Sequence, residues 1–299
     1  MTDRIYSKKM TEIMAQFIKH TAIHLPDDVM SKLGELYEAE DNPRALQIYD
    51  VMFENLRLAE EMERPICQDT GFMQFLIKCG SEFPLLGDLE EVLKEALAEA
   101  TEETPLRLNV VETFSEENTG TNMGPGAPTV WWEIMPGRDN CEIYVYPAGG
   151  GSSMPGASAV LTPSQGYEGA EAFVLERVLE KGPNACPPLL VGVGLGNSSE
   201  TAALNAKRAL LMSVDSVNED EGAALMEKRL EKALNESGIG PQGLGGKNTV
   251  YGVNVVDTAR HPACMGVAVA TGCWVHRRGH ICFDRDLNWK SDTHKDFNY

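Results

Sequence analysis

The stretch Ile66-Cys67-Gln68-Asp69-Thr70-Gly71 places a cysteine two residues from a carboxylate, directly after Pro65. Before it, apolar residues recur at helical spacing and predict three helices, the last of which ends at the proline. After it, the pattern Phe72 to Lys78 predicts a strand. The stretch therefore marks the change from a helical N-terminal lead-in, residues 1–65, to a mixed sheet with flanking helices. The fold class predicted is α/β, in the mixed α+β sense.

Helical and strand patterns alternate through the rest of the chain. The segment Pro136–Asn140 separates two apolar, strand-like runs, and its composition predicts a hairpin turn. No repeat and no low-complexity linker divides the chain, so residues 1–299 are expected to form a single domain. The predicted helices are 86–104, 167–179, 200–212 and 219–235, and the predicted strands are 129–134, 141–146, 189–196, 249–256 and 265–274.

The composition limits the class of protein. The 299 residues are 42% hydrophobic and 24% charged, which is ordinary for a globular protein. No apolar run approaches the roughly 18 residues of a membrane span, and no secretory signal is visible at the start, so cytoplasmic localisation is expected. Seven cysteines without a CxxC pair fit a reducing compartment and disfavour a zinc ribbon, a ferredoxin-type run or a thioredoxin motif.

The charge balance is strongly acidic. Lys and Arg total 26 against 45 Asp and Glu, a formal charge of −19, so nucleic acid is a poor partner. An anionic substrate would need a few basic residues that create a locally positive pocket against this field. The candidates are Arg107, Lys247, His261, Arg277 and Arg278.

Two glycine-rich segments could bind anions through backbone amides. Gly149-Gly150-Gly151 follows a predicted strand, and either an anion site or a flexible linker explains it equally well. Gly192-x-Gly194-x-Gly196 lies at the end of a buried strand before a helix, but its spacing is not GxGxxG. A dinucleotide site there is therefore disfavoured.

Three of the seven cysteines stand in unusual contexts. Cys67 follows a helix end, Cys186 precedes two prolines, and Cys273 lies near a strand end beside Trp274. A reduced cysteine is most often a small buried hydrophobe, and this remains the default interpretation of any single one. Three distant thiolates can also converge as iron–sulfur ligands, although spacing alone does not establish convergence.

Six motifs in order make this sequence similar to a known family. The chain resembles the cluster-bearing α subunit, or N-terminal domain, of the iron–sulfur (class I) fumarases and the related two-subunit fumarate and L(+)-tartrate dehydratases. The motifs are Ile66–Gly71, Asn118-Thr119-Gly120-Thr121-Asn122, Gly149-Gly150-Gly151-Ser152, Ala185-Cys186-Pro187-Pro188, Gly240-Pro241-Gln242-Gly243-Leu244-Gly245-Gly246, and Arg260-His261 with Cys273-Trp274.

The resemblance implies a [4Fe–4S] cluster held by Cys67, Cys186 and Cys273, with Cys264 as the competitor for the last position. One iron is then open to bind substrate as a Lewis acid. Asp69 and His261 are implied as catalytic residues, and Gln68, Arg107, Gly151 and His261 as substrate-binding residues. Without the motifs, Arg107 would suit a surface ion pair, His261 a structural role, and Asp69 a turn cap.

The implied activity is reversible hydration of a dicarboxylate by a hydro-lyase α subunit, and fumarate/malate is the first candidate substrate. L(+)-tartrate or another hydroxy-dicarboxylate is the alternative, and so is a non-catalytic iron–sulfur binding protein with the same fold. Single-chain members of the family continue into a second catalytic domain, so a separate β subunit is expected to carry that half. The α subunit is also expected to pair with itself. Ala148 stands where family members commonly have lysine, which bears on the substrate.

Overall fold

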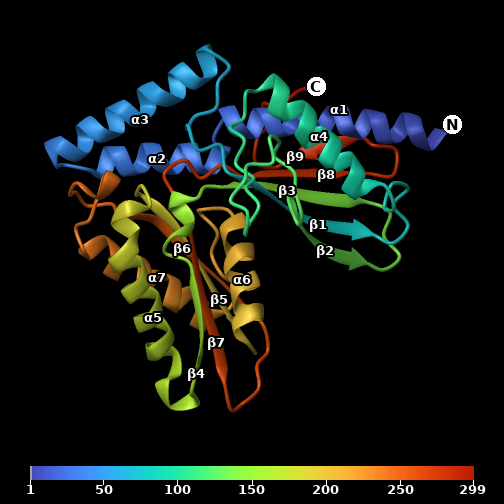
Figure 1. The fold of residues 1–299 in the computed structure, drawn as a ribbon. Helices are drawn as coiled ribbons and strands as arrows, with labels where there is room; N and C mark the ends of the chain where they lie inside the picture. The colour runs from blue at the N-terminus through green and yellow to red at the C-terminus, as the bar shows by residue number, and fades with distance from the viewer. Residues whose placement is uncertain (1) are drawn as a thin grey trace. The chain divides into compact units, whose positions relative to one another are not determined.

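The computed structural model describes residues 2–299, with side chains from Ile5 onward, and divides into two compact units (Figure 1). Unit 1 contains the chain up to Asp27 together with Glu54–Ala148 and Arg277–Tyr299, and unit 2 contains Asp28–Phe53 and Gly149–His276. Each unit has its own sheet. That residues 1–299 act as a single cluster-binding domain stays a prediction.

Unit 1 is a five-stranded sheet covered by two helices. The strand order is β2-β1-β3-β8-β9, in which β1 and β2 are parallel and the other neighbours are antiparallel. The helices are α1 (Thr2–Ile23) and α4 (Leu89–Glu103), and the strands are β1 (Phe72–Gly80), β2 (Thr129–Met135), β3 (Cys141–Ala148), β8 (Gly279–Phe283) and β9 (Trp289–Ser291).

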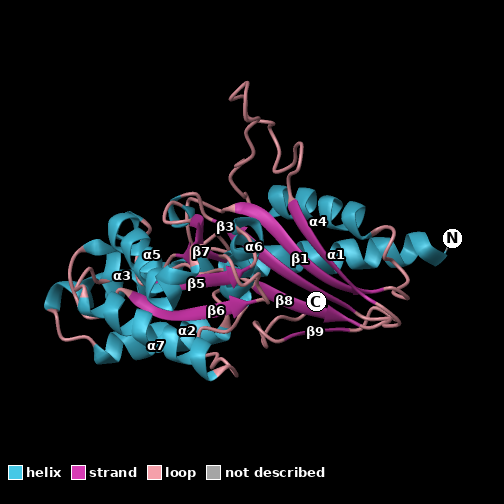
Figure 2. Cartoon of the chain, turned by 90° about the horizontal axis from the view of Figure 1, so that it is seen from below, coloured by secondary structure: helices cyan, strands magenta, loops and turns pink. Residues whose placement is uncertain are grey.

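The core of unit 1 follows from the two periodicities in its sequence. Every second residue of β1 turns toward the helices, and α1 and α4 each present apolar residues three or four positions apart, so the three elements share one dry layer. Figure 2 shows α1 and α4 lying along the same sheet. The layer includes Met10, Ile13, Met14, Phe17, Phe75, Ile77, Leu89, Val92, Leu93, Ile143, Val145, Ile281 and Phe283.

The predicted hairpin across Pro136–Asn140 is wrong. β2 and β3 do not pair with each other, because β1 lies between them in the sheet. The connection instead passes around the end of β1, where the amides of Gly80 and Glu82 donate to the carbonyls of Asn140 and Arg138 at 2.8 and 2.9 Å. Turn composition predicted a reversal correctly, but it does not specify which strand is the neighbour.

Unit 2 is a four-stranded sheet with helices on both faces. The order is β4-β7-β5-β6, with β5 and β6 parallel and the other pairs antiparallel. Its elements are α2 (Asp27–Ala39), the first part of α3 (Pro43–Glu61), β4 (Ala157–Leu161), α5 (Gly166–Lys181), β5 (Leu189–Gly196), α6 (Ser199–Leu211), α7 (Glu221–Glu236), β6 (Val250–Asp257), β7 (Met265–Gly272), and the 3-10 turns η1 (Gly151–Ser153), η2 (Pro163–Gln165), η3 (Gly182–Asn184) and η4 (Pro241–Gly243).

The glycines of β5 are explained by helix packing. A Cβ atom at Gly192 or Gly194 would overlap the backbone oxygens of Ala206 and Ala202, so only glycine lets α6 lie this close to the strand. The opposite face of β5 carries large apolar side chains that pack with α5 and α7. Gly192-x-Gly194 is therefore a packing motif in this protein.

The mixed α/β class and the helical lead-in are confirmed, with two mixed sheets present. Ser198 caps the start of α6, where its side chain accepts a hydrogen bond from the amide of Thr201 at 3.3 Å. The short strands β4, β8 and β9 were not predicted, since three to five residues carry too little pattern. Among residues 2–299, no helix has both the length and the apolar character needed to cross a bilayer.

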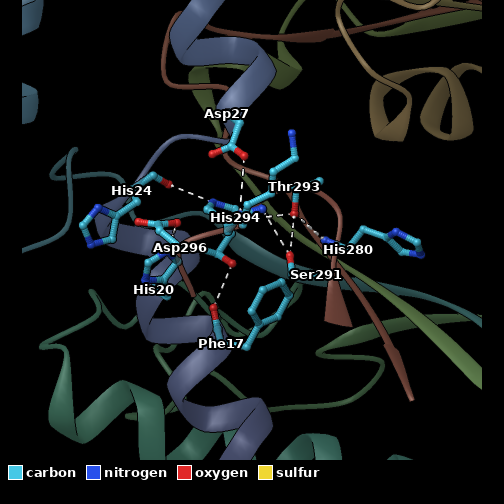
Figure 3. A network of polar contacts seen from close by, with 11 residues as sticks. Phe17, His20, His24, Asp27, His280, Ser291, Thr293, His294 and Asp296 are labelled. Atoms are coloured by element: carbon cyan, nitrogen blue, oxygen red, sulfur yellow. Dashed lines mark hydrogen bonds and ion pairs between the residues drawn. The ribbon is translucent and has the colours of Figure 1, made fainter. Parts of the chain in front are cut away.

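A buried histidine network joins the C-terminal segment to α1 in unit 1 (Figure 3). His294 is 1% exposed, and its Nε2 lies 3.4 Å from the carbonyl oxygen of His24. Thr293 Oγ1 accepts from the amide of His280 at 2.9 Å and lies 3.0 Å from His294 Nδ1. These partners suit a neutral ring that donates from Nε2 and accepts at Nδ1. The ring of His20 packs edge-on, with centroids 5.0 Å apart.

Acid is expected to destabilise this network. Burial is the main cause that lowers the pKa of His294 to about 3, and neighbouring His20 lowers it further. Because the unfolded chain binds the proton more readily, the stabilisation is complete above the unfolded pKa of 6.5 and is lost as pH falls below it. For one such histidine, the free energy of unfolding should drop by about 2 kcal/mol from pH 7 to pH 5. Urea unfolding at both pH values measures this.

The control for this prediction is His294→Gln, which keeps polar atoms but cannot titrate. The variant can be less stable at pH 7, yet its stability should fall less between pH 7 and pH 5 than that of the unmodified chain. The charged and titratable neighbours that also act on the ring are His20, Asp296 and Arg278. An equal loss in both proteins would show that His294 does not control the acid response.

Candidate functional site

The loop that carries Cys67 is held at both sides by unit 1. The amide of Ile66 donates to the carbonyl of Ala22 at 3.1 Å, and the Asn55 side chain donates to the carbonyl of Ile66 at 2.9 Å. Gly71 has φ +85°, and a Cβ there would lie 2.5 Å from the carbonyl carbon of Pro147, so the loop turns tightly into β1. Between these anchors Cys67 is half-buried.

Asp69 forms a turn and contacts a residue far along the chain. Its Oδ1 accepts from the amide of Gly71 at 3.0 Å, the arrangement of an Asx turn. The same oxygen lies 3.3 Å from Nδ2 of Asn109, which also donates to the carbonyl of Gly71 at 3.1 Å. The turn-cap interpretation of Asp69 is therefore correct as geometry, and the carboxylate is held in a single position.

The segment with Arg107 is fixed against this loop. The amide of Arg107 donates to Thr70 Oγ1 at 3.0 Å. Two asparagines of the Asn118–Asn122 motif hold the same segment, because Asn118 Nδ2 donates to the carbonyl of Leu108 at 2.8 Å and Asn122 Oδ1 accepts from the amide of Asn109 at 3.0 Å. The motif thus positions Arg107 and Asn109 relative to Asp69.

A surface hollow of about 320 Å³ opens between these two segments. Its lining is Arg64, Pro65, Cys67, Gln68, Thr70, Pro105 and Arg107. Two arginines and one cysteine line this hollow, in a chain whose net charge is −19. Such a local excess of positive charge suits an anionic ligand.

Arg277 reaches the same loop from the start of the C-terminal segment of unit 1. Its Nη2 donates to the carbonyl of Asp69 at 2.7 Å. The side chain is buried, and its Nε and Nη1 have no hydrogen-bond partner. This is the second predicted cation, after Arg107, that lies beside the Cys67 loop.

Unit 2 brings the other two predicted ligands together. The amide of Trp274, next to Cys273, donates to the carbonyl of Cys186 at 3.0 Å. Cys186 has φ +58°, an uncommon conformation for a residue with a side chain, and it is exposed. Cys273 is half-buried, with Sγ 3.7 Å from the carbonyl of Val275. A strained backbone at an exposed cysteine is typical of a functional site.

His261 lies on an exposed loop whose shape determines how the ring is used. Its amide donates to Asn197 Oδ1 at 2.9 Å, and its Nδ1 accepts from the amide of Ala263 at 3.1 Å. The neutral ring therefore carries its proton on Nε2 and presents it to solvent as a donor. Arg260 braces the loop through the carbonyls of His261 and Cys264, both at 3.3 Å.

The Gly149–Gly151 segment is an ordered turn. The hydroxyls of Ser152 and Ser153 donate to the carbonyl of Gly149 at 3.1 and 2.8 Å, and Thr271 Oγ1 binds the carbonyl of Ser152. Gly151 is exposed, and a Cβ there would meet nothing within 4 Å. The linker interpretation is disfavoured, and a ligand can approach the backbone at Gly151.

Three further cysteines, Cys79, Cys141 and Cys264, have partners elsewhere. Cys79 and Cys141 face each other across β1 and β3 and are fully buried. The hydrogen bond with the neighbouring Cys79 thiol, and then burial, raise the pKa of Cys141, as expected for an inert core thiol. Cys264, the competing ligand, donates its thiol to the carbonyl of Asn197 at 3.4 Å. Lys247, another predicted cation, pairs with Asp41 at 2.6 Å.

The structure thus groups the predicted residues by unit. Cys67, Gln68, Asp69 and Arg107 lie together in unit 1, and Cys186 lies beside the Cys273 segment in unit 2. Within either unit, the described residues hold no group of three His, Cys, Asp or Glu side chains arranged as a metal site. Sequence reasoning missed Arg64 and Asn109. The position of Arg64, three residues before Cys67, could have indicated a role at this site. No feature of the sequence distinguishes Asn109 from other loop asparagines.

Comparison with known proteins gives consistent matches over the length of the chain. The family model described as fumarate hydratase (Fumerase) matches residues 11–282. The L(+)-tartrate dehydratase subunit alpha of Escherichia coli K12 is 50% identical over 286 residues, which are 96% of this chain and 94% of that protein. The putative L(+)-tartrate dehydratase subunit alpha of Methanocaldococcus jannaschii is 36% identical over 274 residues, 90% of this chain and 96% of that protein.

Proposed function

Since the chain belongs to the fumarate hydratase (Fumerase) family of iron–sulfur hydro-lyases, we propose that it is the α subunit of a dehydratase for a four-carbon hydroxy-dicarboxylate. L(+)-tartrate is the first candidate substrate and malate/fumarate the second. The observation that carries this order is the 50% identity, over 96% of the chain, to a protein named L(+)-tartrate dehydratase subunit alpha. The sequence alone had suggested the opposite order.

The proposed cofactor is a [4Fe–4S] cluster held by Cys67, Cys186 and Cys273. Their chemistry fits, because each is a thiol on an exposed or half-buried loop, whereas Cys79 and Cys141 are sealed in the core. The buried, unpartnered nitrogens of Arg277 beside the Cys67 loop also suit an anionic group. When bound, such a cluster supplies a Lewis acid toward hydroxyl and carboxylate oxygens.

The protein residues are proposed to bind and orient the substrate. Arg107, with Arg64 in the same hollow, would bind one carboxylate by charge-assisted hydrogen bonds. The Nε2–H of His261 and the backbone at Gly151 would donate to substrate oxygens, which makes the proton α to a carboxylate easier to remove. Gln68 would help to orient the substrate, and the fixed carboxylate of Asp69 would hold or move a proton.

A separate β subunit is proposed to complete the site. Both relatives described above carry the name subunit alpha. The partner would supply further groups that bind the second carboxylate and work with Asp69 in the proton transfer. We also propose pairing of α subunits, and a cytoplasmic location that suits seven reduced cysteines without a disulfide among the described residues.

The experiment is an anaerobic assay of the chain co-expressed with its candidate β subunit and reconstituted with iron and sulfide. Ultraviolet absorbance follows oxaloacetate formed from L(+)-tartrate and fumarate formed from malate. A higher kcat/KM for L(+)-tartrate than for malate is expected. A preference for malate would reverse the order of substrates, and silence on both with the cluster intact would favour the non-catalytic iron–sulfur protein.

A further inference from the structure

Arg277 is a buried cation whose donors are only partly used. The residue is 3% exposed, and one of the three nitrogens of its side chain, Nη2, donates to the carbonyl of Asp69. The other two, Nε and Nη1, are buried without a partner. Native proteins pair nearly all such groups, so each exception requires an explanation.

One hydrogen bond to a carbonyl does not offset the free-energy cost of removing the guanidinium charge from water. Guanidinium stays charged at any pH a protein tolerates, so the side chain cannot become neutral to escape the cost of leaving water. Buried charges are found paired with an opposite charge or with a bound ion. An anion that accepts hydrogen bonds from Nε and Nη1 would satisfy both the charge and the two donors at once.

The hydrogen bond to Asp69 places Arg277 at the Cys67 loop. The backbone there is held by Gly71 and Asn109 through the Asp69 carboxylate, so the carbonyl that anchors Arg277 has a defined position. We propose that Arg277 binds the anion held beside Cys67, donating from Nε and Nη1. The acceptor is either a sulfur of the cluster or a carboxylate oxygen of the substrate. This inference rests on the proposed function, because that function supplies the anion.

The alternative is that Arg277 only braces the turn at Asp69. Two substitutions separate these roles. Arg277→Gln keeps an amide donor but removes the charge and the Nη1 donor, whereas Arg277→Lys keeps the charge on a single nitrogen. Arg285→Gln is the matched control, since Arg285 is an exposed arginine of the same unit. Its Nη1 lies 3.8 Å from Oδ2 of Asp139.

The test compares the four proteins after anaerobic reconstitution with iron and sulfide. Iron and sulfide per chain, the rate of iron release to a chelator and the electron paramagnetic resonance spectrum report on the cluster without substrate. Altering groups around a metal site commonly costs about 10–100-fold in metal affinity. If the acceptor is the cluster, Arg277→Gln should release iron about tenfold faster, with a changed spectrum, and Arg277→Lys should be intermediate.

If the acceptor is the substrate, iron release should stay unchanged. KM for L(+)-tartrate should then rise by about tenfold in Arg277→Gln, with partial recovery in Arg277→Lys. Unchanged iron release, spectrum and KM in Arg277→Gln would overturn the inference. Circular dichroism of each chain shows whether it has folded, and Arg277→Lys serves as the test protein if Arg277→Gln has not.

The two proposals fail in different ways. If the unmodified chain with its partner is inactive on both substrates, the proposed function fails. Faster iron release from Arg277→Gln would still support anion binding at Arg277 in that case. If the unmodified enzyme is active and Arg277→Gln matches it in every measurement, only the inference about Arg277 fails.

Discussion

Cys67→Ser, Cys186→Ser and Cys273→Ser are each expected to prevent stable cluster binding and to remove hydro-lyase activity. A serine hydroxyl is a poor substitute for thiolate at iron, and each loop supplies one ligand only. The affinity for the cluster should fall by more than the roughly 10–100-fold that is lost when a residue hydrogen-bonded to a metal ligand is altered. Iron and sulfide per chain, the brown colour of the reconstituted protein and the activity measure it.

The control is Cys264→Ser on the His261 loop. Its thiol donates to the carbonyl of Asn197 at 3.4 Å, a role that a serine hydroxyl can keep. This variant should retain iron and activity near the level of the unmodified chain. Full iron content in all three ligand variants would disprove the ligand set, and loss of iron in Cys264→Ser would make that residue a ligand instead.

Asp69→Asn is expected to lower kcat by about 100- to 10,000-fold, the usual contribution of a group that transfers a proton. The asparagine Oδ1 can still accept from the amide of Gly71, so the Asx turn survives while the charge is lost. Iron content should stay normal and KM should change little. Steady-state kinetics with L(+)-tartrate, on protein of known iron content, measure this effect.

The same substitution distinguishes the two interpretations of Asp69. If the residue only caps its turn, Asp69→Asn should be nearly as active as the unmodified enzyme. Asp139→Asn provides the matched control, because Asp139 is an exposed carboxylate of the same unit, outside the residues that line the hollow. Activity close to normal in both variants would leave Asp69 a structural residue.

Much of the fold could be predicted from local patterns. The helical lead-in, α4 to α7 and most strands were predicted, since each contains enough residues to show its period. The family prediction, made from six motifs in order, is confirmed by the family match over residues 11–282. The hairpin failed for a different reason. β1 lies between β2 and β3 in the sheet. The residues of the turn that connects β2 to β3 do not indicate that another strand is inserted between them.

The site was predicted unevenly. Residues inside dense motifs, such as Cys67 and Asp69, could be selected because several unusual features coincide within a few positions. Asn109 could not, since an asparagine in a loop is common and its contact with Asp69 joins positions 40 residues apart. The unpaired nitrogens of Arg277 could not be predicted either, because tertiary packing determines whether a charged side chain is buried.

The amino-acid order alone was sufficient to select the fold class, the family and three unusual thiols, because periodicity and motif spacing are local properties of the chain. The tertiary structure was needed for the rest. It joined the Cys186 and Cys273 segments through one backbone hydrogen bond and placed Arg64 and Arg107 in the hollow with Cys67. It also left two nitrogens of Arg277 buried and unpaired. These features depend on contacts between distant segments, which form only when the sheets and helices pack.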